Sequence, residues 1–211
     1  MSKELMYREH FEISLKNINL VIIQLEKRHY STLNHALLHL FREAGRENTR
    51  LLTYLNNLTL VSLSIRNLFE IYLIAKHIHY DEKALLSWYG QIHKDSKEVK
   101  DGFIALMIRK GQDASELEEM QKFDDEILKA SPFESKSSFN IRGLAEKYGY
   151  LEDYLFVYKL SSKLVHPSSI KIMYYEALTE NTNYLNLVCQ VGIYFSNEFD
   201  VFLQTVLKES G

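Results

Sequence analysis

Helix breakers are scarce in this sequence, and their scarcity limits what the chain can fold into more than any other feature. Only two prolines and eight glycines occur among 211 residues, so a helix that has started meets few positions that force it to stop. Apolar residues recur at steps of three and four, and no stretch alternates long enough for a sheet. The sequence therefore predicts an all-α protein.

Capping residues divide the chain into helices. Ser31 or Thr32, and later Asp81, can accept backbone N–H bonds at helix starts, whereas Gly149 and Pro167 are suited to helix ends. Ser-rich residues 131–139 are expected to form a loop. With no repeat or dividing linker, residues 1–211 are predicted to form a single domain of about six to eight helices. The core helices are expected at about residues 2–29, 31–56, 58–79, 81–108, 150–165 and 184–208, with shorter ones at 115–129 and 140–149.

Charge and cysteine content indicate where such a chain works. A formal net charge of −3 argues against a protein that coats nucleic acid, although it leaves room for a local basic patch. Cys189 is the only cysteine, so no intramolecular disulfide can form, which suits a reducing compartment. The first residues are charged, and uncharged runs such as residues 181–197 are too short and polar to span a bilayer. A cytoplasmic location without membrane contact is expected.

A polar stripe runs along the predicted helix at residues 58–79. At about 100° of rotation per residue, its members fall within an arc of about 80°, while the rest of the helix is apolar. Arg66 and Glu70 are spaced to form an ion pair, either on a strip that faces water or at the rim of a cleft. In a cleft, an arginine held by a glutamate can grip phosphate or carboxylate. The stripe consists of Thr59, Ser62, Arg66, Glu70, His77 and Tyr80.

A second polar group lies at the end of the helix predicted at residues 150–165. Tyr158, Ser162 and His166 are spaced at i, i+4 and i+8, so they lie roughly one above another. A histidine at a helix C-terminus is favoured in its charged form by the helix dipole, which suits proton transfer. The alternative is a histidine that caps the last carbonyls while the serines allow close packing.

Together, Arg66-Asn67-Leu68-Phe69-Glu70 and the later Tyr158-x-x-x-Ser162-x-x-x-His166-Pro167-Ser168 resemble a family of uncharacterised bacterial all-helical proteins. That family looks distantly related to the HEPN superfamily of helical bundles, and the resemblance covers about residue 52 to the C-terminus. It implies a HEPN-like bundle, a homodimer in which the last-but-one helices meet, and a role in a toxin–antitoxin or antiphage system. Many HEPN proteins are metal-independent ribonucleases.

The resemblance also implies roles for individual residues. His166 would act as the acid or base when a ribose 2′-hydroxyl attacks the adjacent phosphate, and Arg66 or Lys163 would stabilise that phosphate. Glu70 would hold Arg66, while Tyr158 and Ser162, like Lys163, would contact the substrate. RNA and an antitoxin or other protein are the expected partners, with no cofactor. The alternative is a non-catalytic protein-interaction module in which these residues form a buried structural network.

Two other patterns lie on the helix predicted at residues 31–56. His35, His39 and Glu43 recur at i, i+4 and i+8, a spacing that could bind zinc, but an exposed face explains them better and no metal site is predicted. Arg42, Arg46 and Arg50 form a basic ridge that two glutamates interrupt, which favours a surface of ion pairs. Phosphate-binding glycine loops and nucleophile elbows are missing from the sequence.

Overall fold

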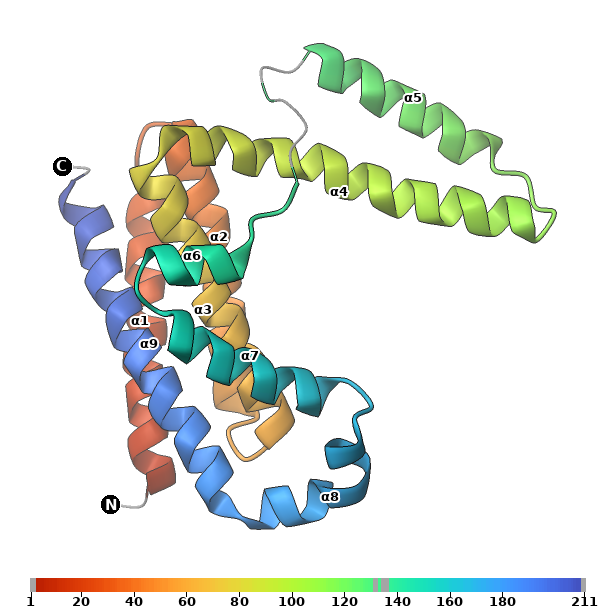
Figure 1. The fold of residues 1–211 in the computed structure, drawn as a ribbon. Coiled ribbons are helices and arrows are strands. Elements are labelled where there is room, and N and C mark those ends of the chain that lie inside the picture. The colour runs from red at the N-terminus through yellow and green to blue at the C-terminus, as the bar shows by residue number, and fades with distance from the viewer. Residues whose placement is uncertain (1–2, 131–132, 134–136, 210–211) are drawn as a thin grey trace. The chain divides into compact units, whose positions relative to one another are not determined.

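The computed structural model describes residues 3–130, 133 and 137–209. Those residues form nine helices and no strand, which confirms the all-α prediction and exceeds the expected six to eight helices (Figure 1). In chain order the helices are α1 (Lys3–Glu26), α2 (Thr32–Thr53), α3 (Leu58–Tyr80), α4 (Glu82–Arg109), α5 (Ser115–Ala130), α6 (Ile141–Lys147), α7 (Leu151–Val165), α8 (Ser169–Glu180) and α9 (Thr182–Lys208).

The local signals for helix ends were largely correct. Ser31 accepts the N–H of Asn34 and Asp81 accepts the N–H groups of Lys83 and Ala84, as expected of N-terminal caps. Helix α7 ends at Val165, directly before the residue that Pro167 keeps out of helical geometry. In the loop expected at residues 131–139, residues 131–132 and 134–136 lie outside the described residues, and the others are not helical.

Helix α8 is the element that the sequence patterns did not predict. Its start is capped by Ser168, whose hydroxyl accepts the N–H of Lys171 at 3.2 Å. Only Leu178 is fully buried among its described side chains, so α8 lacks the apolar stripe that identifies the other helices. The pattern therefore failed here because this helix buries so little of its surface.

The chain divides into two compact units, which are described separately. Unit 1 comprises residues 1–76 and 141–211, and unit 2 comprises residues 77–140. The single domain expected for residues 1–211 remains a prediction.

In unit 1, helix α1 packs against both α2 and α9 (Figure 1). The buried side chains of α1 follow each other at steps of four and three, so they form one seam along the helix. Further in, aromatic rings from α2, α3 and α9 make the core, with Phe69 stacked on Phe195 at a centroid distance of 4.0 Å. The α1 seam consists of Tyr7, Phe11, Ser14, Ile18, Val21 and Leu25.

Helix α3 is apolar around most of its circumference because it packs on several neighbours. Judged by length and composition alone, this helix of 23 residues could cross a membrane, since the mean hydropathy of its most apolar window is 1.5. More than half of that window, 56%, is buried inside the protein, as in the central helix of a bundle. The lack of membrane contact remains a prediction.

The carboxylate of Asp200 on α9 links that helix to α1. It accepts hydrogen bonds from Ser14 Oγ at 3.3 Å and Asn17 Nδ2 at 2.9 Å. Burial raises the pKa of Asp200 above its usual value, although the two hydrogen bonds oppose the shift. Since the folded state then holds the proton more tightly than the unfolded chain, this group stabilises the fold below its unfolded pKa. That stabilisation is lost as the pH rises through the raised folded pKa.

We therefore expect Asp200→Asn to raise the free energy of unfolding at pH 7, because it removes a partly buried charge and its amide can still bond to both partners. The gain should shrink as the pH falls through the raised pKa of Asp200, where the wild-type carboxyl also becomes neutral. Urea denaturation at several pH values measures both effects, with Glu12→Gln at an exposed position of α1 as the control. A lower free energy of unfolding at pH 7 would contradict this account.

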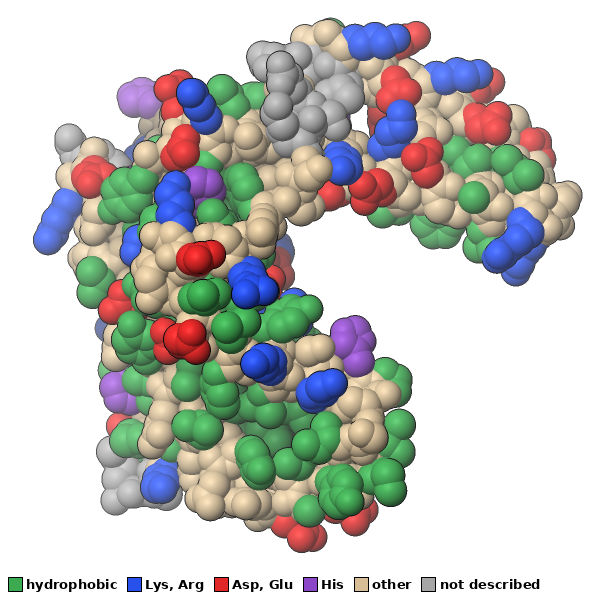
Figure 2. Space-filling view, viewed as in Figure 1, with side chains coloured by type: hydrophobic (Ala, Val, Ile, Leu, Met, Phe, Trp, Pro, Cys, Tyr) green, Lys and Arg blue, Asp and Glu red, His purple; other side chains and the backbone are tan. Residues whose placement is uncertain are grey.

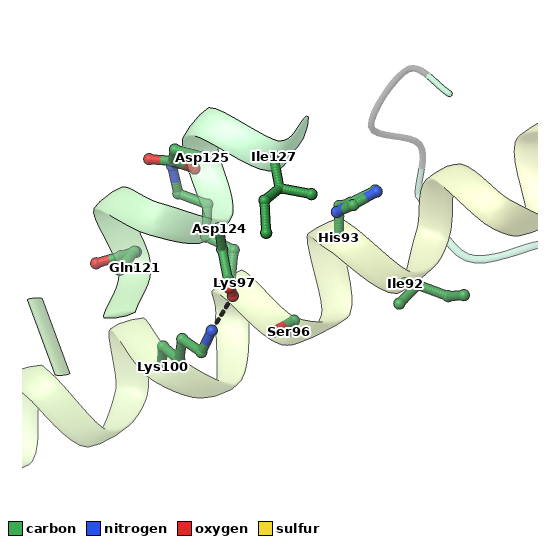
Figure 3. A pocket seen from close by; sticks show the side chains of 9 residues that line it. All are labelled: Ile92, His93, Ser96, Lys97, Lys100, Gln121, Asp124, Asp125 and Ile127. Carbon is green, nitrogen blue, oxygen red and sulfur yellow. Dashed lines mark hydrogen bonds and ion pairs between the residues drawn. The ribbon is translucent and has the colours of Figure 1, made fainter. Parts of the chain in front are cut away.

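In unit 2, helices α4 and α5 form an antiparallel hairpin whose turn contains Gly111 at a φ of 68°. Charged side chains join the two helices: Lys100 pairs with Asp124, and Lys97 lies 3.8 Å from Asp125. Figure 3 shows the groove between the helices, with a volume of about 380 Å³.

Candidate functional site

The site is centred on an ion pair within α3. Arg66 Nε donates to Glu70 Oε1 at 2.8 Å, as the i,i+4 spacing predicted. Their side chains are 24% and 23% exposed, so the pair is neither on an open strip nor sealed in the core. Among the described residues, the two terminal nitrogens of Arg66 have no hydrogen-bond or ion-pair partner. The guanidinium is therefore held in place with its outer edge uncommitted.

Helix α7 supplies an aromatic side chain to this pair. The guanidinium carbon of Arg66 lies over the ring of Tyr158, 4.5 Å from its centroid, although the two residues are 92 positions apart in the chain. Both residues belong to the polar groups that the sequence predicts, and the structure brings them together. Cation–π stacking and the bond to Glu70 hold the guanidinium from two directions.

Two further residues belong to this cluster, and the sequence patterns did not single them out. Tyr154 lies one turn before Tyr158, with the ring centroids 5.5 Å apart. Burial raises the pKa of Tyr154; Glu70 raises it further, whereas Arg66 and Arg142 lower it. Arg142, on the short helix α6, is thus near enough to Tyr154 to affect its pKa. No sequence motif marks Arg142, because its distance from Tyr154 depends on how α6 packs against α7.

The remaining predicted residues lie further along α7. Ser162 is partly buried, whereas Lys163 and His166 are exposed. Because a helix rises about 1.5 Å per residue, His166 lies about 12 Å beyond Tyr158 along the axis. Among the described residues, no hydrogen bond joins His166 to Arg66. Arg66, Glu70 and Tyr158 therefore form one cluster, and His166 lies two turns away.

His166 is the C-cap residue of α7, but its imidazole does not bind the last carbonyls, which was the structural alternative. The hydroxyl of Ser168 donates to the carbonyl of Lys163 at 2.6 Å, and Lys171 Nζ donates to the carbonyl of Val165 at 3.3 Å. These two side chains bind the terminal carbonyls of α7, whereas His166 takes part through its backbone: its N–H donates to the carbonyl of Ser162 and its carbonyl accepts the N–H of Ser168. Its imidazole is not needed to terminate the helix.

The other members of the α3 stripe have structural partners. Ser62 is buried and its hydroxyl donates to the carbonyl of Leu58 at 2.7 Å, so the stripe is not a continuous water-facing strip. Thr59 donates to the hydroxyl of Tyr175 at 3.2 Å. In unit 2, the ring of His77 packs against Phe139 with centroids 5.2 Å apart. The site is therefore narrower than the stripe.

A buried polar network lies elsewhere in unit 1. Lys76 Nζ donates to the hydroxyl of Tyr72 at 2.9 Å, and that hydroxyl is 3.0 Å from the hydroxyl of Tyr150. Tyr150 in turn donates to Glu198 Oε2 at 2.5 Å. Burial is the main cause that raises the pKa of Tyr150. Both tyrosine hydroxyls are bonded on two sides, so this network is suited to fixing how the chain before α7 meets α3 and α9.

The patterns on α2 resolve into ion pairs. Arg42 binds Glu26, Arg46 binds Glu43 and Arg50 binds Glu47, so the basic ridge is a salt-bridged surface, as expected. The rings of His35 and His39 pack with centroids 4.6 Å apart. Within the described part of the chain, no group of three or more histidine, cysteine, aspartate or glutamate residues could hold a metal ion.

Comparisons with known proteins agree with the sequence patterns at the level of an uncharacterised family. No curated protein and no solved structure matches the chain. One family profile matches residues 61–184, a segment that includes Arg66, Glu70, Tyr158 and His166. It is described only as a family of unknown function, and no link to the HEPN superfamily is part of that description. Since the match spans more than half of the 211 residues, the chain belongs to the family of unknown function DUF5677.

Proposed function

We propose that this chain is a HEPN-like helical protein of a bacterial stress or defence system that binds RNA along α7 and cleaves it without a metal. The observation that carries the proposal is the fixed guanidinium of Arg66. Glu70 accepts the hydrogen bond from Nε, and Tyr158 lies against the guanidinium. The two terminal nitrogens therefore remain for a ligand. Two parallel N–H donors match the oxygens of a phosphate, so a phosphodiester is the expected ligand.

The surface around this guanidinium supports an RNA strand over a single small anion. Lys159 and Lys163 are exposed on α7, His166 is exposed directly after its end, and Arg142 lies on the neighbouring α6. Figure 2 shows basic and histidine side chains gathered over α7. A line of basic groups follows a phosphate backbone, and the partly exposed ring of Tyr158 could stack on a base. This local patch is compatible with a chain of formal net charge −3.

His166 lies about 12 Å from Tyr158 along the axis of α7, so we assign binding and proton transfer to two different positions on the RNA strand. His166 would take or give the proton when a 2′-hydroxyl attacks the adjacent phosphate, and Lys163, one turn earlier, would stabilise that phosphate. Arg66 would then hold a different phosphate of the same strand. Binding and cleavage should therefore respond to different substitutions.

For binding, we expect Arg66→Ala to weaken affinity for a fluorescein-labelled single-stranded RNA by about 10- to 100-fold, as for a lost bond to a charged group. The slope of log affinity against log salt should fall by about 0.7, the value for one phosphate contact on a single strand. Fluorescence anisotropy measures both. The matched control is Arg46→Ala, which removes an exposed arginine from α2 and should leave affinity unchanged.

For cleavage, His166→Ala should keep RNA affinity close to that of wild type and abolish RNA degradation and growth arrest in cells expressing the protein. Far-UV circular dichroism confirms that each variant is folded. If wild type binds no RNA, or binds it as tightly as the folded Arg66→Ala variant does, the binding proposal is wrong. If the His166 variant degrades RNA like wild type, the catalytic assignment fails alone.

A protein-interaction module is the second candidate, and helix α8 favours it. Ile172 and Met173 are 71% and 72% exposed, which is unusual for large apolar side chains on a helix in water. Under this reading the fixed Arg66 is structural, and RNA would not bind.

A further inference from the structure

The helical hairpin of unit 2 has an apolar face that no other described residue of that unit covers. On α4, the apolar side chains at four positions fall within about 60° of one another, and three on α5 do the same. Their exposed fractions range from 37% to 62%. Figure 2 shows hydrophobic side chains along this hairpin. We call these seven residues the hairpin face: Ile92, Val99, Phe103, Leu106, Met120, Phe123 and Ile127.

The two stripes lie on the same side of the hairpin. The ion pairs and the hydrogen bond between α4 and α5 join Lys97, Lys100 and Asp101 on one helix to Gln121, Asp124 and Asp125 on the other. Viewed down either helix, the apolar stripe lies about a third of a turn away from these residues, in the same sense of rotation on both helices. Because the helices are antiparallel, this offset turns both stripes towards one face. The pairing also sets Phe103 beside Met120 and Val99 beside Phe123.

The ionic seam explains why this face has no partner within its own unit. Charged residues share the seam between the helices with the half-buried Ile104 and Leu117, so the seven exposed apolar side chains are not buried there, as the bond between Lys100 and Asp124 in Figure 3 illustrates. Helices become stable by covering their apolar stripes with another layer. Two helices joined through their polar sides therefore need a second layer from elsewhere.

We propose that the hairpin face pairs with the hairpin face of a second copy of this chain. A two-fold axis makes a face complementary to itself, and two antiparallel hairpins packed face to face form a four-helix bundle. Seven apolar side chains that are each about half exposed amount to roughly 600 Å² per copy, so pairing buries roughly 1,200 Å² in total, the lower bound for a specific interface. A patch of this size is also at the upper limit for a protein that stays monomeric.

This surface is a different one from α8, whose exposed apolar side chains point in several directions around the helix. At about 100° per residue, Ile170, Ile172 and Tyr174 are spread over more than half of the circumference of α8. The hairpin face instead presents all seven residues in one direction. Helix α8 therefore serves as the competing site in the test.

The test is the mass of the full-length protein in solution, measured by sedimentation equilibrium over a range of micromolar concentrations. Wild type should have twice the 24.8 kDa mass of the chain. Phe103→Glu and Phe123→Glu should each be monomeric with an unchanged helical content, since both side chains are exposed in a single chain and their substitution leaves no cavity. The matched control is Ile108→Glu, on the opposite side of α4 with 60% exposure, which should remain dimeric.

A second measurement locates the interface directly. Val99→Cys lies near the middle of the hairpin face, so mild oxidation should link two copies, whereas Cys189 is buried and should not react. Wild-type protein that is monomeric at every concentration would overturn the proposal. A dimer that survives both glutamate substitutions but is lost in Ile172→Glu would overturn it as well, and would assign the interface to α8.

Discussion

Replacing Phe69 by alanine should lower the free energy of unfolding by about 3–5 kcal/mol, the usual cost of removing a buried phenylalanine. The side chain is fully buried, stacks on Phe195 at 4.0 Å, and lies about 6 Å from the rings of Tyr150 and Tyr154. These neighbours come from α9, from the residue before α7 and from α7 itself. They cannot all close over the space that the ring leaves.

Urea denaturation followed by far-UV circular dichroism measures the loss. Phe69→Leu keeps more of the volume and should lose less, and Tyr30→Ala, at a site with 79% exposure, should stay within about 0.5 kcal/mol of wild type. A loss below about 1 kcal/mol for Phe69→Ala would show that the packing around α3 is loose. Since Glu70 is the next residue, such looseness would also weaken the argument for a fixed Arg66.

Gly192→Ala should also destabilise the protein, by about 1–3 kcal/mol, although alanine is the better helix former. A Cβ at this position of α9 would lie 2.6 Å from Ile65 Cδ1, 2.9 Å from Ile65 Cγ1 and 3.2 Å from Phe11 Cζ. Both neighbours are buried, so neither can move aside without disturbing α3 or α1. The glycine therefore allows α9 to approach two helices closely.

The chain contains a matched control for this substitution. Gly102 lies in α4, is exposed, and would place a new Cβ with no atom within 4 Å. Gly102→Ala should raise the free energy of unfolding by up to about 1 kcal/mol, since only the helix propensity changes. The two substitutions are chemically identical, and thermal melting should separate them by sign. Destabilisation of both to the same extent would refute the close approach at Gly192.

The sequence by itself determined the features that depend on neighbours along the chain. Scarce prolines and glycines, together with caps such as Ser31 and Asp81, located all the long helices to within a few residues. The same local geometry predicted the pair of Arg66 and Glu70, because positions i and i+4 meet in any α-helix. It failed for α8, which buries too little apolar surface to leave a periodic pattern.

Only the tertiary structure decided which of the polar residues meet. Contacts across helices depend on how each helix is rotated and packed, and no spacing in the sequence records this. Packing brought Tyr158 to the Arg66 pair, placed His166 two turns from Tyr158, and joined Tyr72 to Tyr150 and Glu198. It also left the apolar stripes of α4 and α5 on one open face, because the charged positions of the two helices took the seam between them.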